Sequence, residues 1–240
     1  ESSRAVRARD LNRYLKDVGW ASAPVLEGDP PPADSAKPDA ISDPLNTVAA
    51  SASDCALCRL SEKRKTGVFG VGDPHADLMF IGEGPGAEED RTGRPFVGQA
   101  GQLLDRMLFA IGCDRHDVYI TTIVKCRPPG NRDPKEDEVA ACSPYLDRQI
   151  DLIAPKVIVA LGKPASHRLT GTTKPISALR GRWASYTGIP LMPLFHPAYM
   201  LRTPSAKREA WEDLKKIKQR IDPSGTKEIV VRALGQDKIE

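Results

Sequence analysis

Four short, continuous apolar runs constrain the fold of this chain more than any other feature of its sequence. They lie at residues 77–82, 118–124, 156–162 and 189–195. Their Ile, Val, Leu and Phe residues follow one another without polar alternation, which indicates strands that are buried on both faces of a sheet. Helical spacing of apolar residues occurs at 99–111, 136–153 and 206–221. Strands that alternate with helices in this way predict an α/β fold, a parallel sheet with helices on both sides.

The N-terminal part of the chain differs in composition from this α/β region. Residues 4–20 have apolar side chains at near-helical spacing, so we expect a helical segment over residues 1–21. Residues 22–53 contain six prolines among scattered Ala, Ser and Asp, and they offer no apolar face, which is typical of a linker. The predicted organisation is therefore a helical segment (1–21), a linker (22–53), a folded domain (54–220) and a tail (221–240).

Length and composition favour one medium-sized domain with appendages. The chain has 240 residues and a net charge of +3, which alone does not require an anionic partner. No stretch approaches the roughly 18 consecutive apolar residues of a membrane helix, and the charged first residues lack the apolar core of a signal peptide. Five cysteines, an odd number, argue against a disulfide scaffold. We therefore expect a cytoplasmic protein without membrane contact.

The glycine-rich turn after the first run is a candidate ligand site, since ligands bind beyond the carboxyl ends of strands in such sheets. The turn reads Gly82-Glu83-Gly84-Pro85-Gly86, and with Ala87 it formally fits a dinucleotide fingerprint. Pro85 lacks a backbone donor, and the acids at 88–90 would face a pyrophosphate, so a nucleotide cofactor is disfavoured. Those acids suit the dipole of a helix N-terminus. A flat, neutral ligand fits this turn better, with Glu83 placed to act on it.

Two other side chains are candidates for the same site. His196 follows the fourth run, so it would share the carboxyl edge of the sheet with Glu83. A lone histidine is more often structural, but this shared edge favours a catalytic role. Phe96 lies in the loop 93–98, where an aromatic side chain normally fills a packing gap and could equally provide a stacking face.

Four of the five cysteines suit a metal site. Cys55 and Cys58 form a CxxC pair before the first run, Cys126 follows the second run, and Cys142 lies on the next helix. Four thiolates from two segments can bind zinc or carry a four-iron cluster, and spacing does not separate these two. Cysteines that are merely buried are another interpretation. A redox pair is disfavoured, because thioredoxin-like pairs follow a strand and open a helix.

Basic residues flank these cysteines and recur along the last helical segment. They are Arg59, Lys63, Arg64 and Lys65 near the first pair, Lys125, Arg127, Arg132 and Lys135 near Cys126, and seven more between residues 202 and 220. Because the linker is acidic, the near-neutral total hides a basic folded domain. A solvated helix face explains one such cluster, but three clusters near one candidate site favour contacts with nucleic acid phosphates.

Together these motifs resemble the family-4 uracil-DNA glycosylases, the iron–sulfur branch of that superfamily. The resemblance spans about residue 54 to about residue 220. It rests on the order and spacing of Cys55-x-x-Cys58, 82–90, 93–98, 125–132, Cys142-Ser143-Pro144 and 196–202. It implies a three-layer α/β/α sandwich around a four-stranded parallel sheet. It also implies hydrolysis of the N-glycosidic bond of uracil in DNA, which leaves an abasic site for base excision repair.

The resemblance further implies roles for individual residues. A [4Fe–4S] cluster would bind to Cys55, Cys58, Cys126 and Cys142. The glycine turn, with Gly82, Glu83, Gly84, Pro85 and Gly86, corresponds to the motif that handles water and contacts uracil through the backbone. Phe96 corresponds to the aromatic that stacks on uracil, and His196 to the histidine that hydrogen-bonds to uracil O2. Expected DNA contacts are Arg127, Arg132, Tyr199, Met200, Leu201 and Arg202, the apolar ones filling the vacated base stack.

One position departs from the family pattern. Where the family usually has an asparagine that reads uracil, this chain has Thr122, whose hydroxyl is shorter and offers one donor. Weaker uracil selectivity, another base preference and a contribution from Asn131 are all open. The alternative function is a catalytically weak iron–sulfur DNA-binding homologue. We expect a monomer acting on uracil in single- or double-stranded DNA, because one lesion needs one pocket.

Overall fold

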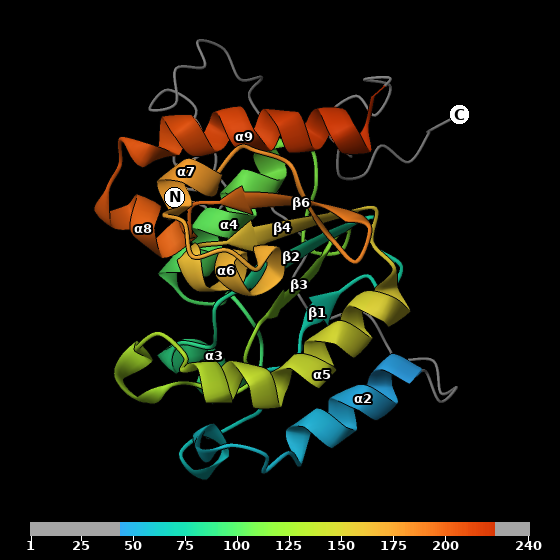
Figure 1. Cartoon of the computed structure of the whole chain (residues 1–240), viewed down its shortest axis with the longest axis vertical. Helices are drawn as coiled ribbons and strands as arrows, with labels where there is room; N and C mark the ends of the chain where they lie inside the picture. Colours follow the sequence, from blue (N-terminus) through green and yellow to red (C-terminus); the bar gives the residue numbers. More distant parts are fainter. Residues whose placement is uncertain (1–43, 224–240) are drawn as a thin grey trace, which may run out of the picture.

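The computed structural model describes residues 44–223, which form a β-sheet with helices on both faces (Figure 1). The helical segment predicted for residues 1–21, residues 22–43 of the predicted linker and residues 224–240 of the tail lie outside the described residues. Between residues 44 and 223, no helix is both long and apolar enough to cross a membrane.

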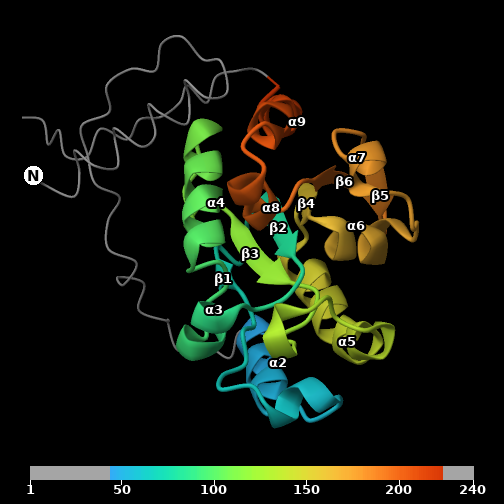
Figure 2. The same cartoon turned by 90° about the vertical axis from the view of Figure 1, so that its left-hand side faces the viewer.

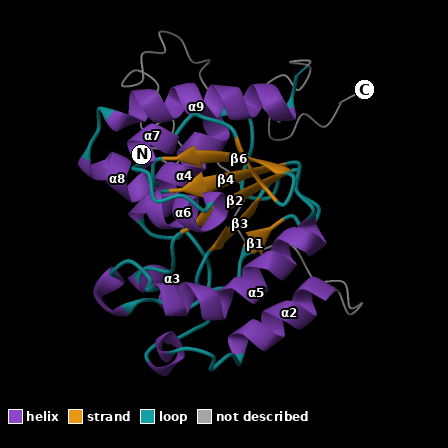
Figure 3. Cartoon of the chain, viewed as in Figure 1, coloured by secondary structure: helices purple, strands orange, loops and turns teal. Residues whose placement is uncertain are grey.

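The sheet of the described residues has six strands in the order β1-β3-β2-β4-β6-β5 (Figure 3). The four predicted runs form its central strands, all parallel: β2 (Leu78–Gly82), β3 (Tyr119–Thr122), β4 (Val157–Leu161) and β6 (Ile189–Leu194). The outer strands β1 (Val71–Gly72) and β5 (Ala184–Tyr186) pair antiparallel with β3 and β6. The prediction of four strands was therefore incomplete, because two or three residues are too few to show a strand pattern.

Two apolar cores on opposite faces of the sheet confirm the three-layer α/β/α sandwich (Figure 2). Strand side chains alternate between them: Phe80 and Val159 belong to one core, Met79 and Ile158 to the other. The first core includes residues of α4 (Gln99–Ala110), α8 (Pro197–Arg202) and α9 (Ala206–Ile221). The second includes residues of α5 (Glu136–Ile153) and α6 (Lys163–Thr170). The shorter helical elements are η1 (Arg59–Glu62), α3 (Ala87–Thr92), η2 (Pro129–Asn131) and α7 (Ile176–Leu179).

The last ten residues of the predicted linker form a helix, α2 (Pro44–Ser53). Leu45 is buried in the second core, and Ala52 is buried as well. The Tyr145 hydroxyl of α5 donates a hydrogen bond to the Ser51 carbonyl at 3.3 Å, and α2 lies beside α5 (Figures 1 and 2). The linker prediction was wrong here because the buried stripe is small and follows a proline-rich stretch. Pro44 itself suits the first position of a helix.

The topology brings four loops to one edge of the sheet. From β2 the chain crosses to β3 on one side, and the next parallel strand, β4, lies on the other side of β2. In open α/β sheets, ligands bind at such a reversal, beyond the carboxyl ends of the strands. The loops that follow β2, β3, β4 and β6 therefore meet at this edge, which we call the carboxyl edge.

Candidate active site

Glu83 is the first residue after β2, and backbone hydrogen bonds hold its turn to the loop after β3. The Ile123 amide donates to the Gly82 carbonyl at 2.9 Å, and the Val124 amide donates to the Glu83 carbonyl at 3.3 Å. A Cβ at Gly84 would lie 2.8 Å from the Val124 Cγ2 atom, so glycine permits this close approach. The glycine turn therefore has one defined position relative to β3.

The environment of Glu83 makes its carboxyl group titrate near neutral pH. Burial and, to a smaller extent, the nearby Asp133 raise the pKa of Glu83 to about 7, with Lys163 opposing the shift. Neither Asp133 nor Lys163 was predicted from the sequence as part of the site. Lys163 could have been found, since it is the second residue after β4, at the same carboxyl edge. At neutral pH, Glu83 is therefore ionised in only a fraction of the protein molecules, and in those its carboxylate can accept a hydrogen bond from water.

His196 follows β6 and is the N-cap residue of α8. Its Nδ1 atom accepts a hydrogen bond from the Ala198 amide at 3.2 Å. Burial and, to a smaller extent, the nearby Arg202 lower the pKa of His196 to about 4, with Glu89 opposing the shift. The ring is therefore neutral at physiological pH, and because Nδ1 is an acceptor, its proton lies on Nε2. This leaves Nε2–H as the donor for a ligand.

Phe96 brings a buried aromatic ring between the glycine turn and His196. The ring centroids of Phe96 and His196 are 5.6 Å apart, with the planes at 30°. A Cβ at Gly82 would lie 2.5 Å from the Phe96 Cζ atom, so the ring packs directly on the Gly82 backbone. Phe96 has a φ of 53°, in the left-handed region that residues with side chains rarely adopt. The structure thus brings Gly82, Phe96 and His196 together at the carboxyl edge.

Thr122 is the last residue of β3 and lies opposite Gly82 in the sheet register. Its side chain is buried, and its hydroxyl donates a hydrogen bond to the Val124 carbonyl at 2.8 Å. A Cβ at Gly82 would lie 3.5 Å from the Thr122 Cγ2 atom, which places the Thr122 methyl beside the glycine turn. The hydroxyl hydrogen is already used within the protein, so only its oxygen can accept from a ligand.

Asn131 lies on the η2 turn and is exposed. Its side-chain oxygen accepts a hydrogen bond from Arg127 Nε at 2.8 Å, and its φ is 54°. The side-chain contacts of Asn131 are therefore made within the loop that follows Cys126.

The predicted DNA-contact residues divide into exposed and internally paired side chains. Tyr199 and Leu201 on α8 are 40% and 41% exposed, and Arg202 is exposed. Met200 is fully buried in the first core, because α8 turns its side chain toward α4 and the sheet. The prediction that Met200 contacts DNA is therefore wrong for this structure. Arg132 donates to both carboxylate oxygens of the buried Glu138, at 2.8 and 2.6 Å.

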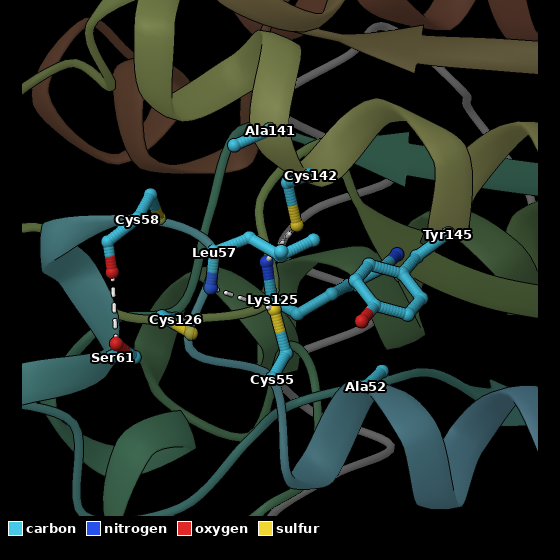
Figure 4. A pocket seen from close by; sticks show the side chains of 10 residues that line it. All are labelled: Ala52, Cys55, Leu57, Cys58, Ser61, Lys125, Cys126, Ala141, Cys142 and Tyr145. Atoms are coloured by element: carbon cyan, nitrogen blue, oxygen red, sulfur yellow. Dashed lines mark hydrogen bonds between the residues drawn. The ribbon is translucent and has the colours of Figure 1, made fainter.

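Cys55, Cys58, Cys126 and Cys142 line one pocket (Figure 4). The space within the pocket is about 280 Å³, part of it open to solvent. Three N–H groups donate to these sulfurs: Arg64 Nη1 to Cys126 at 3.1 Å, the Lys125 amide to Cys142 at 3.3 Å and the Leu57 amide to Cys55 at 3.5 Å. Four thiols, once deprotonated, are a ligand set for zinc or for an iron–sulfur cluster. Within residues 44–223, no group of three or more His, Cys, Asp or Glu side chains is arranged as a site for a metal ion.

Burial shapes the electrostatics of this pocket. It raises the pKa of the Cys142 thiol to about 11 and that of Cys126 above its ordinary value, with Arg64 opposing the latter shift. Burial also lowers the pKa of Lys125 to about 7. Lys125 Nζ donates to Thr121 Oγ1, the Thr122 carbonyl and Gln149 Oε1 at 2.5–2.7 Å. Lys125 therefore joins the cysteine pocket to the end of β3, and the prediction that it contacts phosphate is wrong.

The comparisons with known proteins agree with this arrangement. The family model of the uracil DNA glycosylase superfamily matches residues 69–215. The Type-4 uracil-DNA glycosylase of Sulfurisphaera tokodaii is 45% identical over 188 residues, which cover 74% of this chain and 84% of that protein. The Type-4 uracil-DNA glycosylase of Thermotoga maritima is 46% identical over 175 residues, covering 71% and 91%. A Type-5 uracil-DNA glycosylase of Pyrobaculum aerophilum is 34% identical over 145 residues, covering 53% and 63%. The family predicted from the motifs is thus confirmed, and this chain belongs to the uracil DNA glycosylase superfamily.

Proposed function

We propose that this chain is a monofunctional uracil-DNA glycosylase, which hydrolyses the N-glycosidic bond of uracil in DNA and leaves an abasic site for base excision repair. The observation that carries the proposal is the meeting of the Glu83 turn, the Phe96 ring and His196 at the carboxyl edge. The Type-4 names of relatives that are 45% and 46% identical support it. A catalytically weak DNA-binding homologue is not favoured, because a protein that only binds DNA has no need of this arrangement.

His196 is suited to stabilise the departing base. Cleavage of the N-glycosidic bond places negative charge on uracil and positive charge on the sugar. The neutral His196 ring carries its proton on Nε2, since Nδ1 accepts from the Ala198 amide. A fixed Nε2–H donor directed at uracil O2 stabilises the negative charge without first giving up a proton.

Glu83 is suited to the sugar side of the reaction. Its carboxylate can orient a water molecule and accept the proton that the water loses on attacking the sugar. The same negative charge stabilises the developing positive charge, as carboxylates do in other glycosyl transfers. The backbone hydrogen bonds from Ile123 and Val124 fix the turn that carries it. Glu83 and His196 would therefore act on opposite partners of the same bond.

Phe96 and Thr122 would define the base pocket. The uracil has to leave the duplex stack to reach it, which costs a few kcal/mol and favours mispaired or unpaired uracil. The Phe96 ring lies beside His196 and offers one face for stacking. Thr122 offers only its hydroxyl oxygen, because the hydrogen is donated to Val124. An acceptor suits the uracil N3–H group, so we propose that Thr122 contributes one hydrogen bond to recognition, with the backbone of Gly82, Gly84, Pro85 and Gly86 completing the pocket.

The four cysteines would hold a [4Fe–4S] cluster. When bound, such a cluster would cross-link the segment with Cys55 and Cys58 to the segment with Cys126 and Cys142. Because the first segment precedes β1 and the second follows β3, this link would fix the basic loops around both. The roles proposed for Glu83 and His196 use no group of this pocket.

The exposed side chains of Tyr199, Leu201 and Arg202, together with Arg127 and Arg132, would face DNA. Tyr199 and Leu201 are the exposed apolar groups of α8, next to His196, and could fill the space that the uracil vacates. We propose that the protein acts as a monomer, because one lesion needs one pocket. We also propose that it accepts single- or double-stranded DNA. The cytoplasmic location stays a prediction.

Single-turnover cleavage of a uracil-containing oligonucleotide tests the function, with hypoxanthine and xanthine strands alongside and protein of known iron content. We expect alkali-labile breaks at uracil, lost in His196→Ala and kept in His116→Ala, a control at an exposed histidine. Breaks at another base alone would show a changed base preference. No cleavage of any strand by iron-loaded protein would contradict the glycosylase proposal.

A further inference from the structure

The loop that carries Phe96 is held from two sides. From α3, Glu89 Oε1 accepts hydrogen bonds from the amides of Val97 at 2.9 Å and Gly98 at 3.0 Å. From the loop after α4, Arg115 Nη1 donates to the Pro95 carbonyl at 3.1 Å and Nη2 donates to the Phe96 carbonyl. The two side chains thus engage the peptide groups on both sides of the Phe96 Cα atom.

These hydrogen bonds hold Phe96 in a backbone conformation that is unfavourable for a residue with a side chain. The φ of 53° at Phe96 lies in the left-handed region, which a residue with a Cβ keeps only where its surroundings impose it. Gly101 on α4 contributes by leaving space, since a Cβ there would lie 1.7 Å from the Phe96 carbonyl oxygen. Backbone strain of this kind tends to cluster at functional sites.

Glu89 also connects this loop to the glycine turn. Its Oε2 atom accepts a hydrogen bond from the Gly86 amide at 3.1 Å, while Oε1 holds Val97 and Gly98. One carboxylate therefore sets the position of the turn relative to the Phe96 loop. Arg115 is anchored in the same way, because its Nε atom donates to Asp105 Oδ1 on α4 at 2.5 Å.

We infer that Glu89 and Arg115 form a clamp that fixes the Phe96 ring in its stacking orientation, so that both are positioning residues of the base pocket. The inference rests on the proposed function, because it assigns the ring an excised base to stack on. The adjacent acid Glu88 has a different environment: it is exposed and pairs with Arg91 at 2.8 Å. Glu88 is therefore a matched control on the same helix with the same charge.

Hydrogen exchange tests the clamp without using any DNA. In Glu89→Ala, the Val97 and Gly98 amides lose their acceptor, so their exchange should become about tenfold faster or more. Glu88→Ala should leave these amides unchanged, and the amides of α9 should be unchanged in both variants. Equal protection of Val97 and Gly98 in Glu89→Ala and the unaltered protein would overturn the clamp. A protein that cleaves no uracil would contradict the proposed function while leaving this measurement intact.

Kinetics then test whether the clamp acts through Phe96. A misplacement of about 1 Å can cost on the order of a hundredfold in rate, so we expect Glu89→Ala to lower the single-turnover excision rate roughly 10- to 100-fold. Affinity for uracil-free DNA should stay within about twofold. We expect the inhibition constant of free uracil to rise in Glu89→Ala and in Phe96→Ala alike. The excision rate of the double variant should be no lower than that of Phe96→Ala alone.

Two variants keep this test decisive if Glu89→Ala folds poorly. Glu89→Gln retains one acceptor oxygen for Val97 and Gly98, so it should keep more activity than Glu89→Ala. Arg115→Ala removes the other half of the clamp and should show the same lack of additivity with Phe96→Ala. Effects that multiply in the double variants would show that Glu89 and Arg115 act independently of Phe96, and would overturn the inference.

Discussion

The carboxyl edge and the cysteine pocket are held together in different ways. At the carboxyl edge, Glu83 and His196 lie just after the ends of β2 and β6. Backbone hydrogen bonds from Ile123 and Val124 fix the glycine turn. The segment with Cys55 and Cys58 is tied to the rest of the domain more through side chains, such as Arg64 to Cys126. Its exposed ion pair between Arg59 and Asp137 adds little. The sheet thus fixes the geometry of the carboxyl edge, whereas side-chain contacts contribute more to the cysteine pocket.

The largest effect is expected from a methyl group at the carboxyl edge. In Gly82→Ala, the new Cβ would lie 2.5 Å from the Phe96 ring and has to displace it. We expect the single-turnover excision rate to fall about 100-fold, with DNA affinity and iron content unchanged. Gly67→Ala is the control in the cysteine-side segment, since its Cβ would make an ordinary contact of 3.5 Å. An unaffected rate in Gly82→Ala would show that the ring is free to move.

Loss of a pocket cysteine should have the opposite pattern of effects: it should lower iron content and stability more directly than it lowers the excision rate. We expect Cys126→Ala to lower iron content and to destabilise the fold by about 3 kcal/mol, which is roughly 6–12 °C in Tm for a chain of this size. Cys113→Ala is the matched control, because Cys113 does not line the pocket. Iron analysis and calorimetry measure both effects. Unchanged iron content in Cys126→Ala would remove this residue from the ligand set.

The pH dependence of excision should report Glu83. Its pKa of about 7 means that the active carboxylate is lost as the pH falls, so the rate should decrease about tenfold per pH unit below 7 and level off above it. Lys163→Ala removes a charge that lowers this pKa and should move the midpoint up. Asp133→Asn removes one that raises it and should move the midpoint down. Profiles that are identical in all three proteins would assign the titration to another group.

The smallest change is expected at Thr122. Thr122→Asn restores an amide that can both donate and accept, and one added hydrogen bond of about 1 kcal/mol corresponds to roughly a fivefold faster excision of uracil. Thr122→Val keeps the shape and removes the hydroxyl, so it should be slower than the unaltered protein. Single-turnover rates on uracil and hypoxanthine strands separate rate from base preference. No gain in Thr122→Asn would mean that other groups already read the base.

Sequence reasoning predicted that Glu83 and His196 lie at one edge of the sheet, because both positions are local to the strands. Glu83 and His196 each follow an apolar run, and parallel strands bring such positions to one edge. The roles of Glu89 and Arg115 were not predictable in this way. Glu89 lies in the first turn of α3 and accepts from the Gly86 amide, as expected of an acid at a helix N-terminus, but its other oxygen reaches amides eight and nine residues further along the chain.

The burial of individual side chains also could not be predicted from the sequence. Lys125 was grouped with the basic residues expected to contact phosphates, yet it is fully buried and donates hydrogen bonds to Thr121 and Gln149. Met200 stands between two exposed neighbours on α8, and only the rotation of that helix against the core decides which side chain is covered. Both outcomes depend on tertiary packing and not on local pattern.

The pairing of Arg132 with Glu138 has a consequence for the ionic-strength dependence of DNA binding. The affinity of a protein for DNA falls with salt in proportion to the number of phosphate charges that it neutralises, since each releases condensed counterions. Arg132 already shares its charge with a buried carboxylate at 2.6 Å, so it would release fewer ions than an unpaired arginine. Because Glu138 already orders the Arg132 side chain, DNA binding would cost little further side-chain entropy at this residue. Arg132 would thus contribute shape to the complex more than it contributes to the salt slope.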